Sequence, residues 1–153
     1  MISKSRTAVV SLALSASALV GIAVHEGYKG NAYLDSVNVP TIGFGTTKDV
    51  KLGDTIDPVK ALQRKIADVQ SFEGALKQCV KVPLHQYEYD AYLSLAYNIG
   101  PTAFCNSTLV RRLNEQKYEE ACKQILRWDM AGGQRLAGLT KRRQAEYKQC
   151  LGS

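Results

Sequence analysis

Histidine is scarce in this chain of 153 residues, which contains only His25 and His85. The four cysteines form no Cys-x-x-Cys pair, the spacing typical of zinc sites. Both absences argue against a metal centre, so we predict no metal ligands. Internal repeats, low-complexity linkers, aromatic-basic RNA motifs and helix-turn-helix signatures are also missing, and we expect no nucleic-acid partner. Nothing in the sequence indicates a stable oligomer, so we expect a monomer.

The length and the charge set broad limits. A chain of 153 residues builds one domain with a real core and is too short for two domains of ordinary size. The formal net charge is +6, and residues 111–148 contain ten Lys or Arg against five acids. A basic surface suits an anionic partner, such as nucleic acid, a membrane or a cell wall. A solvated helical surface explains any single charge equally well.

Hydrophobic periodicity predicts an α+β fold. Residues 28–53 are rich in Gly, β-branched and aromatic residues, which indicates a small antiparallel sheet with a turn near Asn38. The segment at 85–99 is apolar almost all round, as expected for a helix in the middle of a bundle. The other expected helices are one from Asp57 to about 77, a short one capped by Asn106 or Ser107 that ends near 113, one at 117–128, and one from Thr140 to about 151.

Two acids lie close together near the start of the expected sheet. Glu26 and Asp35 are nine positions apart without another carboxylate between them, and Thr41 follows six positions later. Glycosidic hydrolysis needs one protonated and one ionised carboxyl group. Glu26 follows an apolar run that favours its protonated form, whereas Asp35 lies among hydrogen-bonding residues that favour its ionised form. Thr41 would orient water, and Gly43 and Gly45 predict close approach of the backbone to a ligand or strand.

The motif Glu26-x8-Asp35-x5-Thr41, between His-Glu-Gly and Gly-Phe-Gly, resembles the catalytic signature of phage-type lysozymes, glycoside hydrolase family 24. The similarity continues through most of the chain after residue 24. In that family the matching Glu is the proton donor, the Asp is the second carboxylate, the Thr positions water, and no cofactor is required. Many relatives carry His where this chain has Thr46. This departure puts a supporting contact in doubt, not the acid pair.

The resemblance also implies a lysozyme-like fold, with a small sheet lobe, a mostly helical lobe and the active-site groove between them. Tyr97, Asn98 and Ser107 match positions near the substrate groove, although packing and helix capping explain them equally well. Arg142 or Arg143 matches a family arginine that pairs with the catalytic Glu. The sequence does not decide between these two arginines.

The even number of cysteines is compatible with two disulfides in an oxidising compartment, and three pairings are possible. Resemblance to cysteine-bearing relatives favours Cys79 with Cys105 and Cys122 with Cys150. Four buried free thiols are the alternative.

The N-terminal segment differs in composition from the rest. Residues 1–6 carry Lys4 and Arg6 and no acid, and residues 7–24 form an uncharged run of 18 residues. As a helix this run spans about 27 Å, slightly less than the roughly 30 Å hydrocarbon core. Eight of its residues are Val, Leu or Ile and the other ten are Ala, Ser, Gly or Thr. We expect export machinery to insert it and lipid to hold it weakly.

A cleaved signal peptide, with a site at Ala16-Ser17-Ala18, a permanent anchor and a releasable anchor are all compatible with this segment. It resembles the signal-anchor-release segments of some phage endolysins, and we favour that interpretation because Val24 almost adjoins Glu26. We therefore expect an anchor at residues 1–24 and a catalytic domain at 25–153. The anchor contains no cysteine, which excludes thiol exchange between anchor and domain as the trigger.

Taken with the resemblance, these features predict an endolysin that hydrolyses peptidoglycan from the periplasmic side after release from the host inner membrane. A lytic transglycosylase is the nearest rival, and a membrane-tethered cell-wall-binding module without catalysis is a second alternative.

Overall fold

The computed structural model describes residues 5–153. Residues 1–4, which include Lys4 of the predicted basic start, lie outside the described residues. The chain divides into two compact units. Unit 1 comprises Met1–Ser15 and Phe72–Ser153, and unit 2 comprises Ala16–Ser71.

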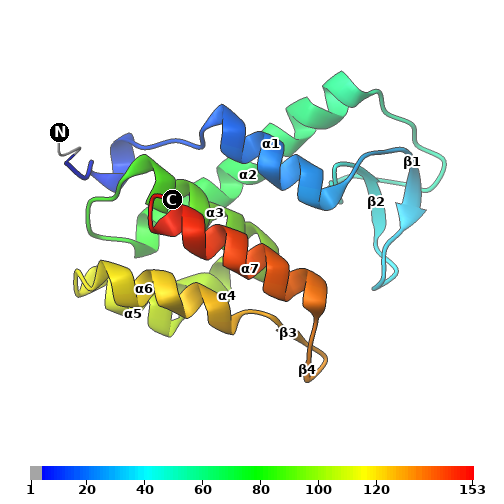
Figure 1. Cartoon of the computed structure of the whole chain (residues 1–153). Helices are drawn as coiled ribbons and strands as arrows, with labels where there is room; N and C mark the ends of the chain where they lie inside the picture. Colours follow the sequence, from blue (N-terminus) through cyan, green and yellow to red (C-terminus); the bar gives the residue numbers. More distant parts are fainter. Residues whose placement is uncertain (1–4) are drawn as a thin grey trace. The chain divides into compact units, whose positions relative to one another are not determined.

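Unit 2 contains a helix, a hairpin and the first part of a long helix (Figure 1). Strands β1 (Lys29–Leu34) and β2 (Pro40–Gly43) pair antiparallel, and Tyr33 lies opposite Thr41. Helix α1 (Ala16–Glu26) precedes them and α2 (Pro58–Cys79) follows. The Asp57 carboxylate accepts the Lys60 amide at 2.9 Å, so the predicted cap of α2 is confirmed. The predicted hairpin is also confirmed.

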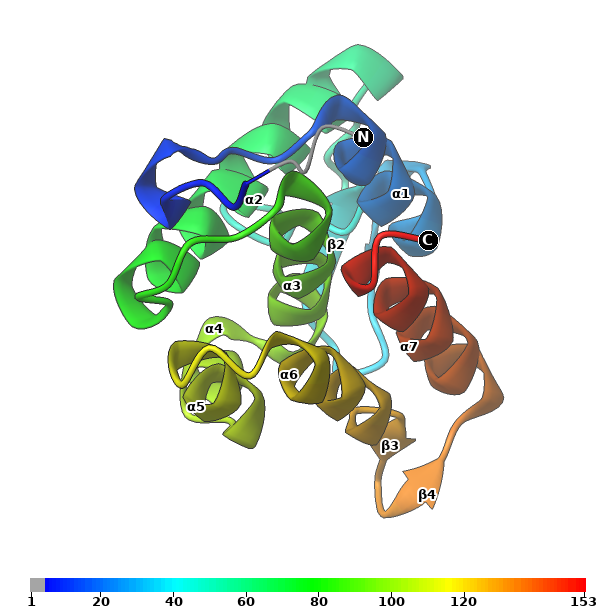
Figure 2. The ribbon, with the colours of Figure 1, turned by 60° about the vertical axis from the view of Figure 1, so that its left-hand side comes forward.

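Unit 1 is built around α3 (Gln86–Ile99), with α5, α6 and α7 around it in Figure 2. Nine successive residues of α3, from 88 to 96, are buried, which confirms the predicted central helix. Its other regular elements are η1 (Val9–Ser11), α4 (Pro101–Cys105), α5 (Thr108–Asn114), α6 (Tyr118–Gln124), η2 (Ile125–Arg127), β3 (Met130–Ala131), β4 (Gln134–Arg135) and α7 (Ala137–Cys150).

Three boundaries differ from those expected. Gly100 ends α3 but also begins α4, because Pro101 suits the first turn of a helix. The helix expected at 117–128 ends at Gln124 and continues as a short 3-10 helix. The last helix begins at Ala137, so Thr140 is not its cap: its hydroxyl instead contacts Asp129 Oδ2 at 3.0 Å and the Leu136 carbonyl.

The predicted membrane segment, residues 7–24, is divided in the structure. Its first part contains the short helix η1 and a β-bridge between Thr7 and Leu84, whereas its second part lies in α1. Within residues 5–153, no helix combines the length and apolar character needed to span a membrane. The structure thus describes this segment in a form other than one continuous membrane helix.

Both disulfides lie in unit 1 and have the pairing that the resemblance implied. Cys79 bonds to Cys105, and Cys122 bonds to Cys150. Cys79 and Cys105 join the end of α2 to the end of α4, and Cys122 and Cys150 join α6 to the end of α7. The prediction of two disulfides is confirmed, and the alternative of four free thiols is wrong.

Candidate active site

Glu26 is the last residue of α1 and is exposed, where the sequence led us to expect apolar surroundings. The helix ends here because Gly27 adopts a positive φ of 71°. Gly45 lies directly against the Glu26 carboxyl group: a Cβ atom built on Gly45 would be 2.9 Å from Glu26 Oε2. The backbone at Gly45 does make a close approach, but its neighbour is the proposed acid at the end of α1 and not the ligand or strand that we expected. Any side chain at position 45 would displace this carboxyl group.

Asp35 and Thr41 are joined through the backbone of Val39. The Val37 and Val39 amides both donate to Asp35 Oδ1 at 2.9 Å. The Val39 carbonyl in turn accepts the Asp35 amide at 3.1 Å and the Thr41 hydroxyl at 2.9 Å. Backbone donors therefore hold the Asp35 carboxylate, as a charged acceptor prefers. Within unit 2, no described residue hydrogen-bonds to Asp35 Oδ2.

The Thr41 side chain is 3 % exposed and its hydroxyl proton is used by Val39. A hydroxyl oxygen also has two lone pairs that accept hydrogen bonds. An oxygen fixed in this way can accept a hydrogen bond from a water molecule. The structure thus joins Asp35, at the turn of the hairpin, to Thr41 of β2 through Val39, and the catalytic roles of both residues stay predictions.

Helix α2 holds the turn that carries Gly45. Ile42 and Thr46 exchange backbone hydrogen bonds of 2.9 and 3.0 Å across this turn. The buried Thr46 hydroxyl donates to Asp68 Oδ2 at 2.5 Å, and the buried Lys65 amino group donates to the Phe44 carbonyl at 2.8 Å. These contacts fix the turn on both sides of Gly45.

Gly43 makes the turn possible at its other end. Its φ is +65°, and a Cβ atom there would lie 2.9 Å from Ala61 Cβ. Only glycine adopts this conformation at such a close approach to a helix without strain. The sequence did not identify Lys65 or Asp68, since a polar residue on a long helix is normally solvated. The periodic face of Ala61, Lys65 and Asp68 was the only available signal.

Two of the three residues predicted near a substrate groove, Tyr97 and Ser107, have structural partners in unit 1. The Tyr97 ring packs against Phe72 with centroids 4.8 Å apart, and Asn98 is exposed. The Ser107 hydroxyl caps α5: it accepts the Val110 amide at 3.2 Å and donates to the Phe104 carbonyl at 2.6 Å. Substrate contact by these three residues stays a prediction.

Arg142 and Arg143 both contact Glu146 inside unit 1. Arg142 Nε lies 3.2 Å from Glu146 Oε1, and Arg143 Nε lies 2.8 Å from Oε2. Ser94 Oγ also donates to Glu146, at 2.7 Å. Burial lowers the pKa of Arg143, which is completely buried, although Glu146 opposes this effect. Arg143 Nη1 is buried without a hydrogen bond to any described residue.

Among the described residues, no group of three His, Cys, Asp or Glu side chains is placed to hold a metal ion. The chemical groups available near the hairpin are therefore two carboxyls, a hydroxyl and backbone amides.

Comparison with known proteins decides the family. The model of the phage lysozyme family matches residues 23–146. The chain belongs to the phage lysozyme family. Its match begins before Glu26 and includes both acids, Thr41 and both candidate arginines.

Individual phage lysozyme relatives agree with this assignment. The chain is 40 % identical over 140 residues to the SAR-endolysin of Pseudomonas phage phiKMV, covering 89 % of this chain and 87 % of that protein. A P22 lysozyme mutant has a similar structure, with 36 % identity, a TM-score of 0.84, and coverage of 92 % of this chain and 99 % of that one. The muramidase domain of SpmX from Asticaccaulis excentricus gives a TM-score of 0.86 at 29 % identity, covering 92 % and 98 %. The lysozyme-like α+β fold is thus confirmed.

Proposed function

We propose that this phage lysozyme is an endolysin that hydrolyses the β-1,4 bond between N-acetylmuramic acid and N-acetylglucosamine in peptidoglycan, and so lyses the host. Membership of the family and the endolysin names of its relatives support hydrolysis of peptidoglycan. The observation that carries the proposal is the arrangement in unit 2. One segment places Gly45 against the Glu26 carboxyl and joins Asp35 to Thr41 through Val39.

Each of these residues has a distinct role in the proposed reaction. Glu26 donates its proton to the leaving oxygen, since it is the acid without a hydrogen bond from any described residue of unit 2. Asp35 is the second carboxylate, and two backbone amides hold its Oδ1 in place. Its Oδ2 then acts on water or on the positive charge that develops on the sugar. Thr41 orients the water through its oxygen lone pairs.

Arg143 is the better candidate for the family arginine. Arg142 uses Nε with Glu146 and Nη2 with the Ser94 carbonyl at 3.4 Å. Arg143 keeps one buried nitrogen without a partner among the described residues. A buried donor of this kind is costly unless it serves an anion.

The enzyme is exported by the host secretion machinery, tethered in the inner membrane, and then released to the periplasm, as the SAR-endolysin names of several relatives support. Residues 7–24 would form the tether. Because Glu26 follows two positions after this segment, tethering would hold it at the membrane surface and away from Asp35. The tethered enzyme would then be inactive.

A turbidity assay on chloroform-treated Gram-negative cells tests the proposal. Purified chain should clear them, and a chain that binds cell wall without clearing it would be a binding module instead. Mass spectrometry of the digested peptidoglycan then separates the two enzyme classes. A muramidase leaves reducing N-acetylmuramic acid ends, whereas a lytic transglycosylase leaves anhydro ends.

A further inference from the structure

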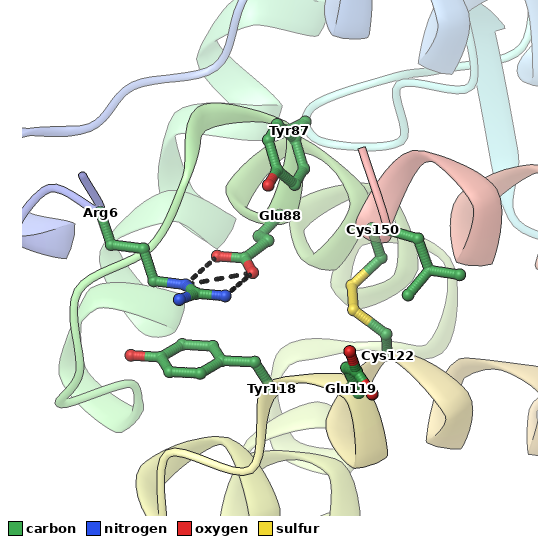
Figure 3. A pocket seen from close by; sticks show the side chains of 8 residues that line it. Arg6, Tyr87, Glu88, Tyr118, Glu119, Cys122 and Cys150 are labelled. Atoms are coloured by element: carbon green, nitrogen blue, oxygen red, sulfur yellow. Dashed lines mark hydrogen bonds and ion pairs between the residues drawn. A yellow bond between two sulfur atoms is a disulfide. The ribbon is translucent and has the colours of Figure 1, made fainter. Parts of the chain in front are cut away.

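Unit 1 contains a binding site for a guanidinium group, and Arg6 occupies it (Figure 3). Arg6 Nη2 lies 2.8 Å from Glu88 Oε1, and Arg6 Nε lies 3.0 Å from Oε2 and 3.2 Å from Oε1. The Glu88 side chain is only 3 % exposed. Two-pronged arginine–carboxylate pairs are among the stronger polar contacts in proteins.

An aromatic ring completes this site. Arg6 Cζ lies 3.5 Å from the centroid of the Tyr118 ring, a distance at which a cation is attracted to the ring face. The Tyr118 hydroxyl donates to the Pro83 carbonyl at 2.9 Å, which fixes the ring. A pocket of about 190 Å³ adjoins this site, and it is lined by Arg6, Glu88 and Tyr118 together with Tyr87, Glu119, Cys122, Cys150 and Leu151.

Glu88 depends on Arg6 for most of its hydrogen bonds. Within the described residues its carboxylate accepts four, of which three come from Arg6 and one comes from the His85 amide. A buried carboxylate without its cation is strongly unfavourable. The hydrogen bond with Glu88 also raises the pKa of Arg6, which keeps the guanidinium group positively charged. The buried Glu88 carboxylate therefore favours the conformation in which the Arg6 guanidinium contacts it.

The residues after Arg6 continue along the same unit. The Thr7 amide and carbonyl exchange hydrogen bonds of 2.8 Å with Leu84. Further on, the Leu14 amide donates to Glu73 Oε1 at 2.6 Å, and the Ser15 hydroxyl donates to Asp90 Oδ2 at 2.6 Å. Val9 and Leu12 are buried between these points. The segment 6–15 is thus held at both ends by carboxylates of unit 1.

We propose that Arg6 is a latch for the released enzyme: a positive charge that first orients the membrane segment later enters the Glu88–Tyr118 site and retains the freed N-terminus. This inference depends on the proposed tether at residues 7–24. Arg6 precedes that tether and Glu88 follows it, so the bilayer separates them until release. The contact forms only in the freed chain, and it opposes return to the membrane.

Arg6→Lys tests the latch because it keeps the positive charge that export requires but cannot reproduce the two-pronged contact or the stacking on Tyr118. The full chain is expressed, the membrane potential is collapsed, and transfer to the soluble fraction is followed. The soluble chain is then treated with thermolysin, and cleavage within residues 7–15 is measured by mass spectrometry. Arg127→Lys, at an exposed position in the same unit, is the matched control.

We expect Arg6→Lys to be exported and tethered like the wild type, but to be cleaved about tenfold faster after release and to accumulate less in the soluble fraction. Tyr118→Leu should show the same defect, and the double variant should add little to either single change. Arg127→Lys should match the wild type. If Arg6→Lys is cleaved at the same rate as the wild type and is released to the same extent, the latch proposal is wrong.

These outcomes are distinct from failure of the proposed function. The thermolysin comparison uses chain that has already reached the soluble fraction, and it requires no muralytic activity. A wild-type chain without muralytic activity would contradict the endolysin proposal and leave that comparison intact.

Discussion

The acids of unit 2 and those of unit 1 have opposite environments. Glu26 is exposed and has no hydrogen bond from a described residue of its unit, and Asp35 uses one carboxylate oxygen for two amides of its own turn. In unit 1, Glu88 and Glu146 are almost fully buried and each contacts an arginine. The first pair keeps oxygen atoms available to a substrate, whereas the carboxyl groups of the second pair are buried against arginine.

This difference in surroundings distinguishes an acid that reacts from an acid that stabilises the fold. An acid that reacts must exchange protons with substrate or water, so it needs an open lone pair or proton. An acid that stabilises a fold is buried with its cation, because burial of an unpaired charge is costly. The comparison predicts that Glu26 affects activity with little effect on stability, whereas Glu88 and Glu146 affect stability first.

The largest effect should come from Glu26→Gln. Loss of the proton donor should lower the rate of cell-wall hydrolysis by about 10²–10⁴-fold, measured on purified peptidoglycan. The temperature of unfolding should stay within about 1 °C of the wild type, because the Glu26 side chain is exposed. Asp49→Asn, at another exposed acid of unit 2, should keep full activity. A Glu26→Gln chain that clears cell wall at the normal rate would refute the assignment.

Glu146→Gln should cause the largest loss of stability. It leaves the buried guanidinium groups of Arg142 and Arg143 without their shared anion, which costs about 3–5 kcal/mol. For a chain of this size the midpoint of thermal unfolding should fall by roughly 10 °C. Glu120→Gln removes an exposed ion pair with Arg112 and should cost less than about 1 kcal/mol. Equal shifts for the two variants would contradict the distinction between buried and exposed acids.

The sequence predicted those features that local rules determine. Asp57 was predicted as a cap, and Asn106 or Ser107 as another, because a short polar side chain satisfies free helix amides; in the structure Ser107 is the cap. Periodicity identified α3, and Gly45 was predicted as a point of close approach. The partners of long-range contacts were not predicted. Neither the match of Arg6 with Glu88 nor that of Thr46 with Asp68 leaves a signal in local sequence.

Thr46 shares features with both groups of acids: it belongs to unit 2, like Glu26 and Asp35, but it is buried, like Glu88 and Glu146. Thr46→Val keeps the shape of the side chain and removes the donor to Asp68, which should lower the free energy of unfolding by about 1–3 kcal/mol. Activity should fall several-fold as well, since the turn places Gly45 against Glu26. Thr46→Ser keeps the hydroxyl and should restore most of both. Unfolding and turbidity assays on the same preparations compare the two effects. A fall in stability without any fall in activity would separate this turn from catalysis.

Ser107→Ala should give the smallest effect and decides between two roles for one hydroxyl. In the structure that hydroxyl donates to Phe104 and accepts from Val110, so both of its hydrogen-bonding capacities are used inside the helix cap. Loss of the cap should cost about 1 kcal/mol of unfolding free energy, and Ser107→Asp should recover most of it. If Ser107 is only a cap, the KM for peptidoglycan fragments should be the same in all three chains. If KM instead rises for both variants, including the one that restores stability, Ser107 contacts the substrate. A side chain of unit 1 would then take part in activity, as Glu26 of unit 2 is proposed to do.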